Sequence, residues 1–267
     1  MKRAILAVIF GSSIIGAHAG DWAKAPAGKS PIEECLDLGG RISVGYMTDF
    51  YIHGMLAAED SVWGDIHYTY EGLAVPVTIG AMYLNGIGPS DTTEVDQLDV
   101  YAHAALGLLF GFDTELGYTH HFQPEDGDFH IPYGEISLKL RRSLGFADLV
   151  LNTNYLTGDG VNPNDHSAEG WYHEVALEKN IAVTDTIGLL LAGGAGYLDG
   201  TLDNPLNGQV GSGWNHYFLK ASLPIMLNCR TTLTPYVAYR SELLFNGSTD
   251  EAEGDNVHSG VSLTVTF

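Results

Sequence analysis

Val257-His-Ser-Gly-Val-Ser-Leu-Thr-Val-Thr-Phe267 is the stretch of the chain that decides its fold. Its odd positions, apart from Ser259, are apolar, and its even positions are small or polar. Because successive side chains of a β-strand point to opposite faces, this alternation predicts an amphipathic strand with one apolar and one polar face.

A strand of this kind at the carboxy terminus, ending on an aromatic residue, resembles the closing strand of bacterial outer-membrane β-barrels. In that family the terminal aromatic is part of the signal read by the barrel-assembly machinery. The resemblance therefore makes Phe267 an expected assembly signal and that machinery an expected partner. The last strand of a soluble sandwich shows the same alternation, so the rest of the chain has to separate the two folds.

The amino terminus has the pattern of an export signal. Lys2 and Arg3 precede an apolar stretch over residues 4–15, and Ala17-His18-Ala19 is a small-x-small cleavage pattern. These features predict a secretory signal peptide over residues 1–19, followed by a periplasmic amino-terminal segment over residues 20–39. No later segment approaches the roughly 18 to 20 apolar residues that a membrane-spanning helix needs.

The chain is strongly acidic, with 33 acidic and 12 basic residues. Cleavage after Ala19 removes two basic residues and no acidic one, so the exported chain is more acidic still. This charge argues against a nucleic-acid partner, which requires a basic surface.

Twelve alternating segments bounded by turn residues follow one another, at 40–52, 62–71, 73–84, 97–109, 112–122, 132–142, 146–156, 170–180, 186–198, 214–226, 231–244 and 256–267. Short connections follow the even-numbered segments, and longer ones follow the odd-numbered segments. Outer-membrane barrels are built in this way, with the short turns periplasmic. We therefore predict an all-β, 12-stranded antiparallel up-and-down transmembrane β-barrel over residues 40–267. Its long loops are expected to be extracellular and both termini periplasmic, in a bacterial outer membrane.

The charged residues are also distributed differently between the short and the long connections. The six long connections contain Asp and Glu but no Lys or Arg, which indicates a negative rim, although selection for solubility would give the same result. Asp159-Gly-Val-Asn-Pro-Asn-Asp165 and Asp250-Glu-Ala-Glu-Gly-Asp255 offer oxygen ligands for weak binding of divalent cations. Neither has the spacing of a dedicated calcium loop, and we predict no resident metal and no cofactor.

The two faces of the predicted strands suit two different environments. Residues 73–84 carry apolar side chains at odd positions and residues 97–109 carry them at even positions, as hydrocarbon contact requires. Ionisable groups on the opposite face cannot lie in a dry core without pairing or neutralisation, but they can lie in a wet lumen. The predicted channel-lining residues are Asp49, Asp65, His67, Asp99, His103, Asp113, Glu115, Glu135, Lys139, Asp148, Glu174, Lys220, Arg240 and Glu242.

Twelve strands enclose more space than the eight that side chains fill, and less than the 16 to 18 strands of a wide porin. We expect a narrow lumen, partly obstructed by inward loops. Its carboxylates outnumber the cations Lys139, Lys220 and Arg240. This excess favours passive diffusion of small cations or neutral polar solutes through the lumen of a barrel that is embedded in outer-membrane lipid. Alternatively, the cations pair with carboxylates across strands, in a closed structural or ligand-binding barrel whose acidic loops meet partners.

The first predicted hairpin adds a resemblance. Gly40-Arg-Ile-Ser-Val-Gly-Tyr-Met-Thr-Asp-Phe-Tyr-Ile-His-Gly54, followed by Trp63-Gly-Asp-Ile-His-Tyr68, resembles the opening of small bacterial porins called TorF-like. Members typically carry Thr-Asp-Tyr and then an Arg-Gly pair. Here Thr48-Asp49-Phe50 stands in the first place, and His53 replaces the arginine. The resemblance implies a porin without a defined solute.

An enzyme is the third alternative. Twelve-stranded outer-membrane phospholipases use a serine, a histidine and an asparagine on the lipid-facing wall. Here His120 and His173 are expected to face lipid, but no serine is placed to act with them. We therefore predict no catalytic residues and no enzymatic activity.

The two cysteines predict a covalent link. Cys35 precedes the first strand and Cys229 lies in a short turn, so the topology places both at the periplasmic end. Because the export compartment is oxidising, we predict a Cys35 to Cys229 disulfide that ties down the amino-terminal segment, with two free thiols as the alternative.

Overall fold

The computed structural model describes residues 38–88, 96–122, 133–158, 170–199, 212–242 and 255–267. Within these ranges, no helix is long and apolar enough to cross a membrane. The signal peptide, the amino-terminal segment up to residue 37 and most of the predicted long loops lie outside the described residues.

The described chain is built from β-strands, and each pairs with antiparallel neighbours. In chain order they are β1 (Gly40–Ile52), β2 (Met55–Tyr70), β3 (Val77–Gly86), β4 (Asp96–Leu109), β5 (Phe112–Phe122), β6 (Tyr133–Ser143), β7 (Asp148–Gly158), β8 (Gly170–Ala182), β9 (Gly188–Asp199), β10 (Gly213–Ser222), β11 (Ile225–Met226), β12 (Thr231–Glu242) and β13 (Asp255–Thr266). The short β11 continues β10, since both pair with β12. The thirteen elements therefore make a barrel of twelve strands.

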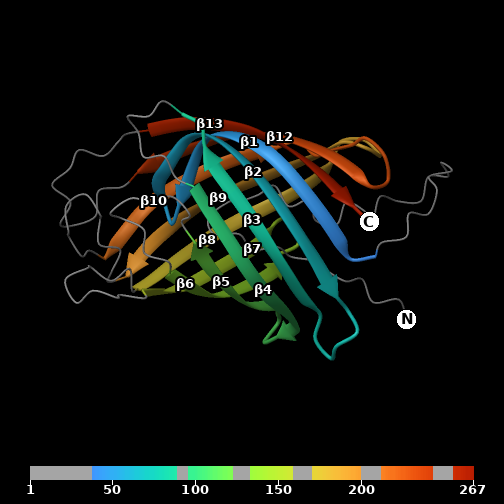
Figure 1. Cartoon of the computed structure of the whole chain (residues 1–267), viewed down its shortest axis with the longest axis horizontal. Helices are drawn as coiled ribbons and strands as arrows, with labels where there is room; N and C mark the ends of the chain where they lie inside the picture. Colours follow the sequence, from blue (N-terminus) through green and yellow to red (C-terminus); the bar gives the residue numbers. More distant parts are fainter. Residues whose placement is uncertain (1–37, 89–95, 123–132, 159–169, 200–211, 243–254) are drawn as a thin grey trace.

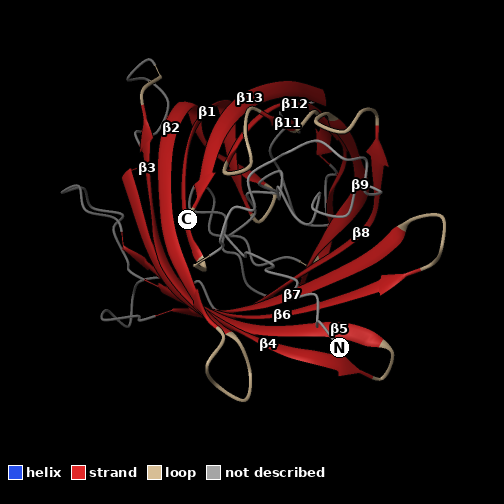
Figure 2. Ribbon diagram, turned by 90° about the vertical axis from the view of Figure 1, so that its right-hand side faces the viewer, coloured by secondary structure: helices blue, strands red, loops and turns tan. Residues whose placement is uncertain are grey.

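The sheet closes on itself, as Figures 1 and 2 show. The first and last strands, β1 and β13, pair from Arg41 opposite Thr266 to Met47 opposite Gly260. At this seam the Phe267 amide donates to the Gly40 carbonyl at 2.9 Å, and the Gly40 amide returns a bond to the Phe267 carbonyl at 3.1 Å. The predicted 12-stranded antiparallel up-and-down barrel is confirmed.

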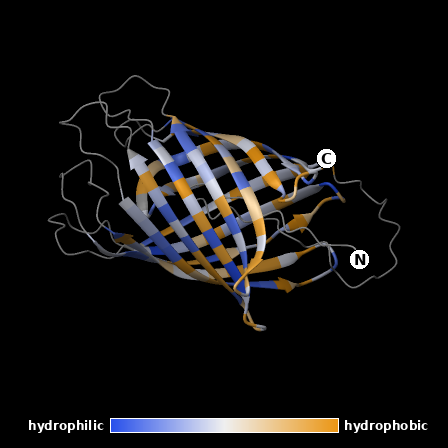
Figure 3. Ribbon diagram, turned by 90° about the horizontal axis from the view of Figure 1, so that it is seen from below, coloured by the Kyte–Doolittle hydropathy of each residue, from blue (hydrophilic) through white to orange (hydrophobic). Residues whose placement is uncertain are grey.

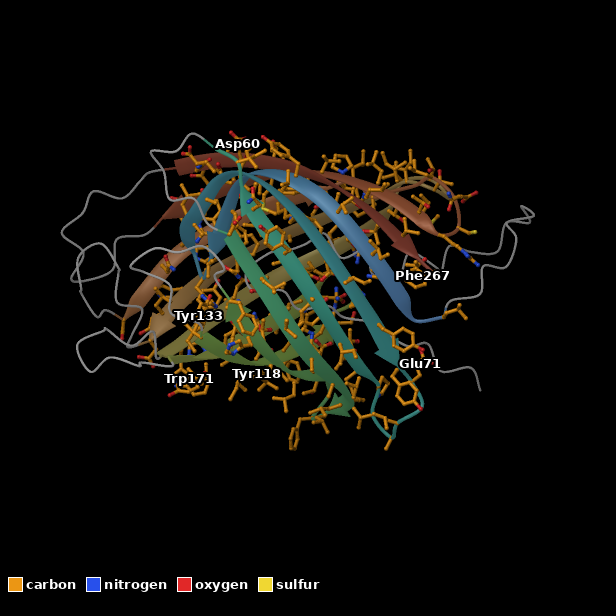
Figure 4. The ribbon with its side chains drawn as sticks, in the orientation of Figure 1. Asp60, Glu71, Tyr118, Tyr133, Trp171 and Phe267 are labelled. Carbon is orange, nitrogen blue, oxygen red and sulfur yellow. The ribbon has the colours of Figure 1, made fainter. Side chains whose placement is uncertain are left out.

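Apolar and polar residues alternate along the strands, and Figure 3 shows the resulting bands of orange and blue. On β1, Ile42 and Val44 are exposed on the outer surface, whereas Ser43 and Met47 are buried. Tyr118 and Trp171 also lie on the outer surface (Figure 4), as expected for aromatic residues where a barrel meets the membrane interface.

The second connection is longer than the sequence predicts. We expect a strand from residue 73, but β3 begins at Val77 and residues 71–76 form the turn. Pro76 has no amide hydrogen for the ladder, and its carbonyl accepts a hydrogen bond from the Ala105 amide at 3.0 Å. The prediction that Leu73 lies on the lipid-facing strand is therefore wrong.

The first connection differs more. Residues 53–61 are predicted to be a long loop, but β1 and β2 continue as a hairpin that turns at His53 and Gly54. Both turn residues have positive φ, 47° and 94°, as a two-residue hairpin turn requires. The prediction of a loop here is wrong, because backbone pairing extends β2 back to Met55.

The hairpin bends where it leaves the wall. Asp60 has a φ of 44°, and its carboxylate accepts a hydrogen bond from the Tyr46 hydroxyl. Nearby, the pairing of β1 with β2 shifts register between Phe50 and Tyr51. Figure 4 shows Asp60 at the end of the barrel opposite Glu71 and Phe267. The segment beyond this bend, residues 50–59, is called the inward hairpin below.

Candidate channel lumen

The tip of the inward hairpin reaches across the lumen. His53 Nε2 lies 2.8 Å from Glu135 Oε2 on β6, and the His53 carbonyl accepts a hydrogen bond of 2.6 Å from Asn215 Nδ2 on β10. The His53 ring also meets the edge of Tyr172 on β8, with ring centroids 5.1 Å apart. Three wall strands therefore hold a buried tip residue that is only 1% exposed.

Gly54 fits this position because it has no side chain. A Cβ at Gly54 would collide with Asn215 Nδ2, Arg240 Nη2 and His216 Nδ1, and the φ of 94° disfavours any other residue. The turn thus lies directly against β10 and β12. The lumen is narrowed from within by the chain's own first hairpin.

On one side of the tip, a buried network of acids and histidines extends over β4 to β6. His121 Nδ1 lies 2.6 Å from Asp99 Oδ1, and its Nε2 lies 3.7 Å from Glu135 Oε2. Gln97 Nε2 donates to Asp99 Oδ1 at 2.7 Å. These four side chains are almost fully buried, so their carboxylates face polar partners and not bulk water.

The network continues towards the end with the short turns. Tyr101 donates a 2.6 Å hydrogen bond to Asp65 Oδ2, while His67 Nδ1 lies 2.7 Å from Asp65 Oδ1. His103 Nδ1 lies 3.6 Å from Glu115 Oε1 on the neighbouring strand. These pairs link β2, β4 and β5 through their inward side chains.

Basic residues also contribute to this lattice. Arg141 Nη2 lies 3.1 Å from Asp148 Oδ2 and 2.8 Å from Glu178 Oε2. Lys139 on β6 stands directly opposite Glu115 on β5. Pairing of lumen charges across neighbouring strands, the alternative considered from the sequence, is present on these strands.

A cavity lies on the other side of the tip, between the inward hairpin and β8 to β13. Its empty volume is about 570 Å³, which includes the solvent space at its mouth. Lys220 Nζ lies 4.1 Å from the centroid of the Tyr236 ring, and Arg240 Cζ lies 4.3 Å from that of Tyr51. We call this space, lined by residues of β1, the hairpin tip, β8, β10, β12 and β13, the hairpin cavity.

The predicted lining residues lie in three groups. The acid and histidine lattice includes Asp65, His67, Asp99, His103, Glu115, Glu135, Lys139 and Asp148. The hairpin cavity is lined by Asp49, Glu174, Lys220 and Arg240. Asp113 is exposed near the turn between β4 and β5, and the side chain of Glu242 lies outside the described part.

Sequence reasoning missed the tip residue His53 and the aromatic residues beside the cations. One signal was present: His53-Gly54 occupies the place where TorF-like porins carry an Arg-Gly pair, and a glycine there suits a two-residue turn. The partners of the tip could not be read from the sequence, because Glu135 and Asn215 are 82 and 162 residues away from it.

One group of side chains has the composition of a hydrolase triad. His103 Nδ1 lies 3.6 Å from Glu115 Oε1, and both the His103 ring and Ser137 Oγ lie beside Gly117. All of these side chains are buried on the inner face of the barrel. The outward His173 contacts Thr153, at 3.2 Å.

Two predictions fall partly or wholly outside the described residues. Cys229 lies in the turn between β11 and β12, but Cys35 is not described, so the disulfide stays a prediction. The loop segments 159–165 and 250–254 proposed for weak divalent cations are not described either. In the described ranges, no group of three or more His, Cys, Asp or Glu side chains is arranged to hold a metal ion.

Solved structures with a similar fold are outer-membrane proteins. An outer membrane channel from Pseudomonas putida F1 matches with a TM-score of 0.54 and 13% identity, over 90% of this chain and 100% of that one. The KdgM porin, in a complex with disordered oligogalacturonate, matches with a TM-score of 0.51 and 9% identity, over 85% and 99% of the two chains. No family model and no curated protein match the sequence. The chain therefore shares the fold of bacterial outer-membrane barrels.

Proposed function

We propose that the protein is a bacterial outer-membrane channel for passive diffusion of small cations and neutral polar solutes. The observation that carries this proposal is a polar lumen narrowed by the inward hairpin, whose tip residue His53 contacts Glu135 and Asn215 on the wall. The similar fold of two outer-membrane channels supports it. The cavity beside the tip, with both acidic and basic side chains in its lining, offers space for small polar solutes.

The proposed orientation follows the general architecture of such barrels, with short turns and both termini in the periplasm. Phe267, at the end of the seam, is proposed to carry the signal for the barrel-assembly machinery. Membership of the TorF-like group belongs to the same proposal and rests on the likeness of the first hairpin, from which His53 departs because the group carries an arginine at that place.

The balance of charge in the lumen supports preference for cations. Among the predicted lining residues, Asp and Glu outnumber the cations Lys139, Lys220 and Arg240. A lumen with a surplus of carboxylates lowers the energy of a passing cation and raises that of an anion.

Planar-bilayer recording tests the proposal. Purified protein inserted into a bilayer is expected to conduct in potassium chloride, with a reversal potential in a salt gradient that shows cation preference. An anion-selective reversal potential would overturn the account of the lumen. Absence of conductance after verified insertion would favour the second candidate, a closed structural or ligand-binding barrel.

That second candidate has one observation in its favour, which is the anchoring of the tip on three wall strands. A variant in which residues 50–59 are replaced by a short glycine-serine loop distinguishes the two candidates. If the hairpin only constricts a channel, wild type conducts and the variant conducts more. If the hairpin closes the barrel, only the variant conducts.

A further inference from the structure

We propose that the hairpin cavity binds a small zwitterionic solute with an apolar or aromatic body, of the chemical class of α-amino acids with large side chains. This inference rests on the proposed channel function, because the cavity lies beside the tip that narrows the lumen. It assigns a solute class to one compartment of that lumen.

The basic side of the cavity is formed by Lys220 on β10 and Arg240 on β12. The two strands are paired, with Lys220 opposite Ala238 and Arg240 opposite Phe218, so the two basic residues project from neighbouring strands. Each cationic group lies over an aromatic ring, at 4.1 Å and 4.3 Å from the ring centroid. These contacts orient both groups in the cavity wall, where they suit a ligand carboxylate.

Acidic side chains line the same cavity from other strands. Asp49 comes from β1, and Glu174 comes from β8. Glu174 accepts a 2.7 Å hydrogen bond from Tyr172 and lies 4.0 Å from His216 Nε2, which fixes its position towards the hairpin tip. In the sheet order β10 and β12 lie between β8 and β1, so one carboxylate lies on either side of the basic pair. A ligand ammonium group can approach one of these carboxylates while the ligand carboxylate approaches the basic pair.

The lining is balanced in charge, with two basic and two acidic side chains. A ligand with only a negative charge would bring its carboxylate near two others, and a ligand with only a positive charge would meet two cations. Each of these ligands would bind less tightly, because it is repelled by the lining groups of its own charge and leaves them desolvated without a partner. A zwitterion complements both pairs together.

The rest of the lining suits an apolar body. Aromatic side chains from β1, β10 and β12, including Phe50, Phe218 and Tyr236, border the cavity. The buried Nδ1 atoms of His216 and His258 have no hydrogen-bond partner among the described residues. The wall therefore combines apolar surface with polar capacity that its own neighbours leave unused, which is typical of small-molecule sites.

Four probes with one phenyl body test the charge requirement. L-Phenylalanine, 3-phenylpropionate, phenethylamine and 2-phenylethanol are titrated calorimetrically into the full barrel in detergent, with empty micelles as the blank. We expect L-phenylalanine to bind about tenfold or more tightly than each of the others. Equal or tighter binding of 3-phenylpropionate, phenethylamine or 2-phenylethanol would overturn the proposal, as would absence of binding by L-phenylalanine.

Two matched lysine variants locate the site. Lys220→Met removes a basic group of the cavity, and it is expected to weaken the binding of L-phenylalanine about tenfold while it strengthens the binding of phenethylamine, which no longer meets that cation. Lys179→Met removes an exposed lysine of β8 outside the cavity and is expected to leave the affinity unchanged. An equal loss in both variants would overturn the assignment, with retained heat-modifiable gel mobility as the check on folding.

Conductance in potassium chloride separates this inference from the channel proposal. A conducting barrel that does not bind L-phenylalanine refutes the inference alone. A barrel that binds L-phenylalanine but does not conduct refutes the channel function on which the inference rests.

Discussion

Replacing His53 by alanine is expected to release the tip of the inward hairpin. The substitution removes the buried contact of 2.8 Å between His53 Nε2 and Glu135 Oε2. The Glu135 carboxylate then keeps His121 Nε2 as a neighbour, at 3.7 Å. A hydrogen bond to a charged group contributes about 1.5 to 3 kcal/mol, so the loss is at most about 3 kcal/mol. About 3 kcal/mol shifts the equilibrium between inserted and withdrawn hairpin by about a hundredfold.

Single-channel recording measures this shift as the fraction of time spent in a state of larger conductance. We expect that fraction to rise in His53→Ala by up to about a hundredfold over wild type. In Gly54→Ala the added methyl group collides with Asn215 and Arg240 at the same tip. This variant is also expected to spend a larger fraction of time in the state of larger conductance.

His173→Ala is the matched control, because His173 also has a hydrogen-bonding partner, Thr153, but faces outward. It is expected to conduct like wild type. The reasoning fails if correctly folded His53→Ala shows the wild-type distribution of conductances, or if the control changes as much.

Three further outcomes are expected. Arg141→Met leaves its two carboxylate neighbours without their guanidinium partner and is expected to lower the free energy of unfolding by about 2 kcal/mol, measured by urea titration in lipid vesicles; an unchanged midpoint contradicts this. Deletion of Phe267 removes the proposed assembly signal and two backbone hydrogen bonds with Gly40, so the yield of heat-modifiable barrel in outer membranes should fall several-fold; wild-type yield would refute the role. The predicted bond between Cys35 and Cys229 should shift gel mobility on reduction, and quantitative thiol labelling before reduction would exclude it.

The architecture was readable from the sequence because a barrel wall repeats one physical rule. Side chains alternate between lipid and lumen along regular strands, so the face on which each side chain lies in a stretch such as residues 97–104 follows from its own residues. The seam was also predictable, because a membrane barrel leaves no strand edge unpaired and residues 257–267 form its last strand.

The inward hairpin could not be predicted from the sequence, because no pattern in its own residues indicates that it folds into the lumen. Residues 55–60 read Met-Leu-Ala-Ala-Glu-Asp, an apolar run followed by two acids, and this lacks the alternation of a wall strand. Their pairing is stabilised by contacts of the adjoining tip with β6, β8 and β10. The start of β3 was missed for a simpler reason, since the effect of Pro76 on the ladder outweighed the apolar alternation around it.

The seam between β1 and β13 has a consequence for the timing of folding. All other wall contacts join strands that are neighbours in the chain, whereas Ser43 and Thr264 bond across a separation of 221 residues. Pairing of β1 with β13 therefore has the largest entropy cost of loop closure, and it cannot occur before the whole chain is present. Until then both terminal strands expose unpaired backbone groups that can recruit other chains. An incomplete chain therefore forms an open sheet with two unpaired edge strands. Only pairing of the final strand with β1 closes the sheet and removes both edges.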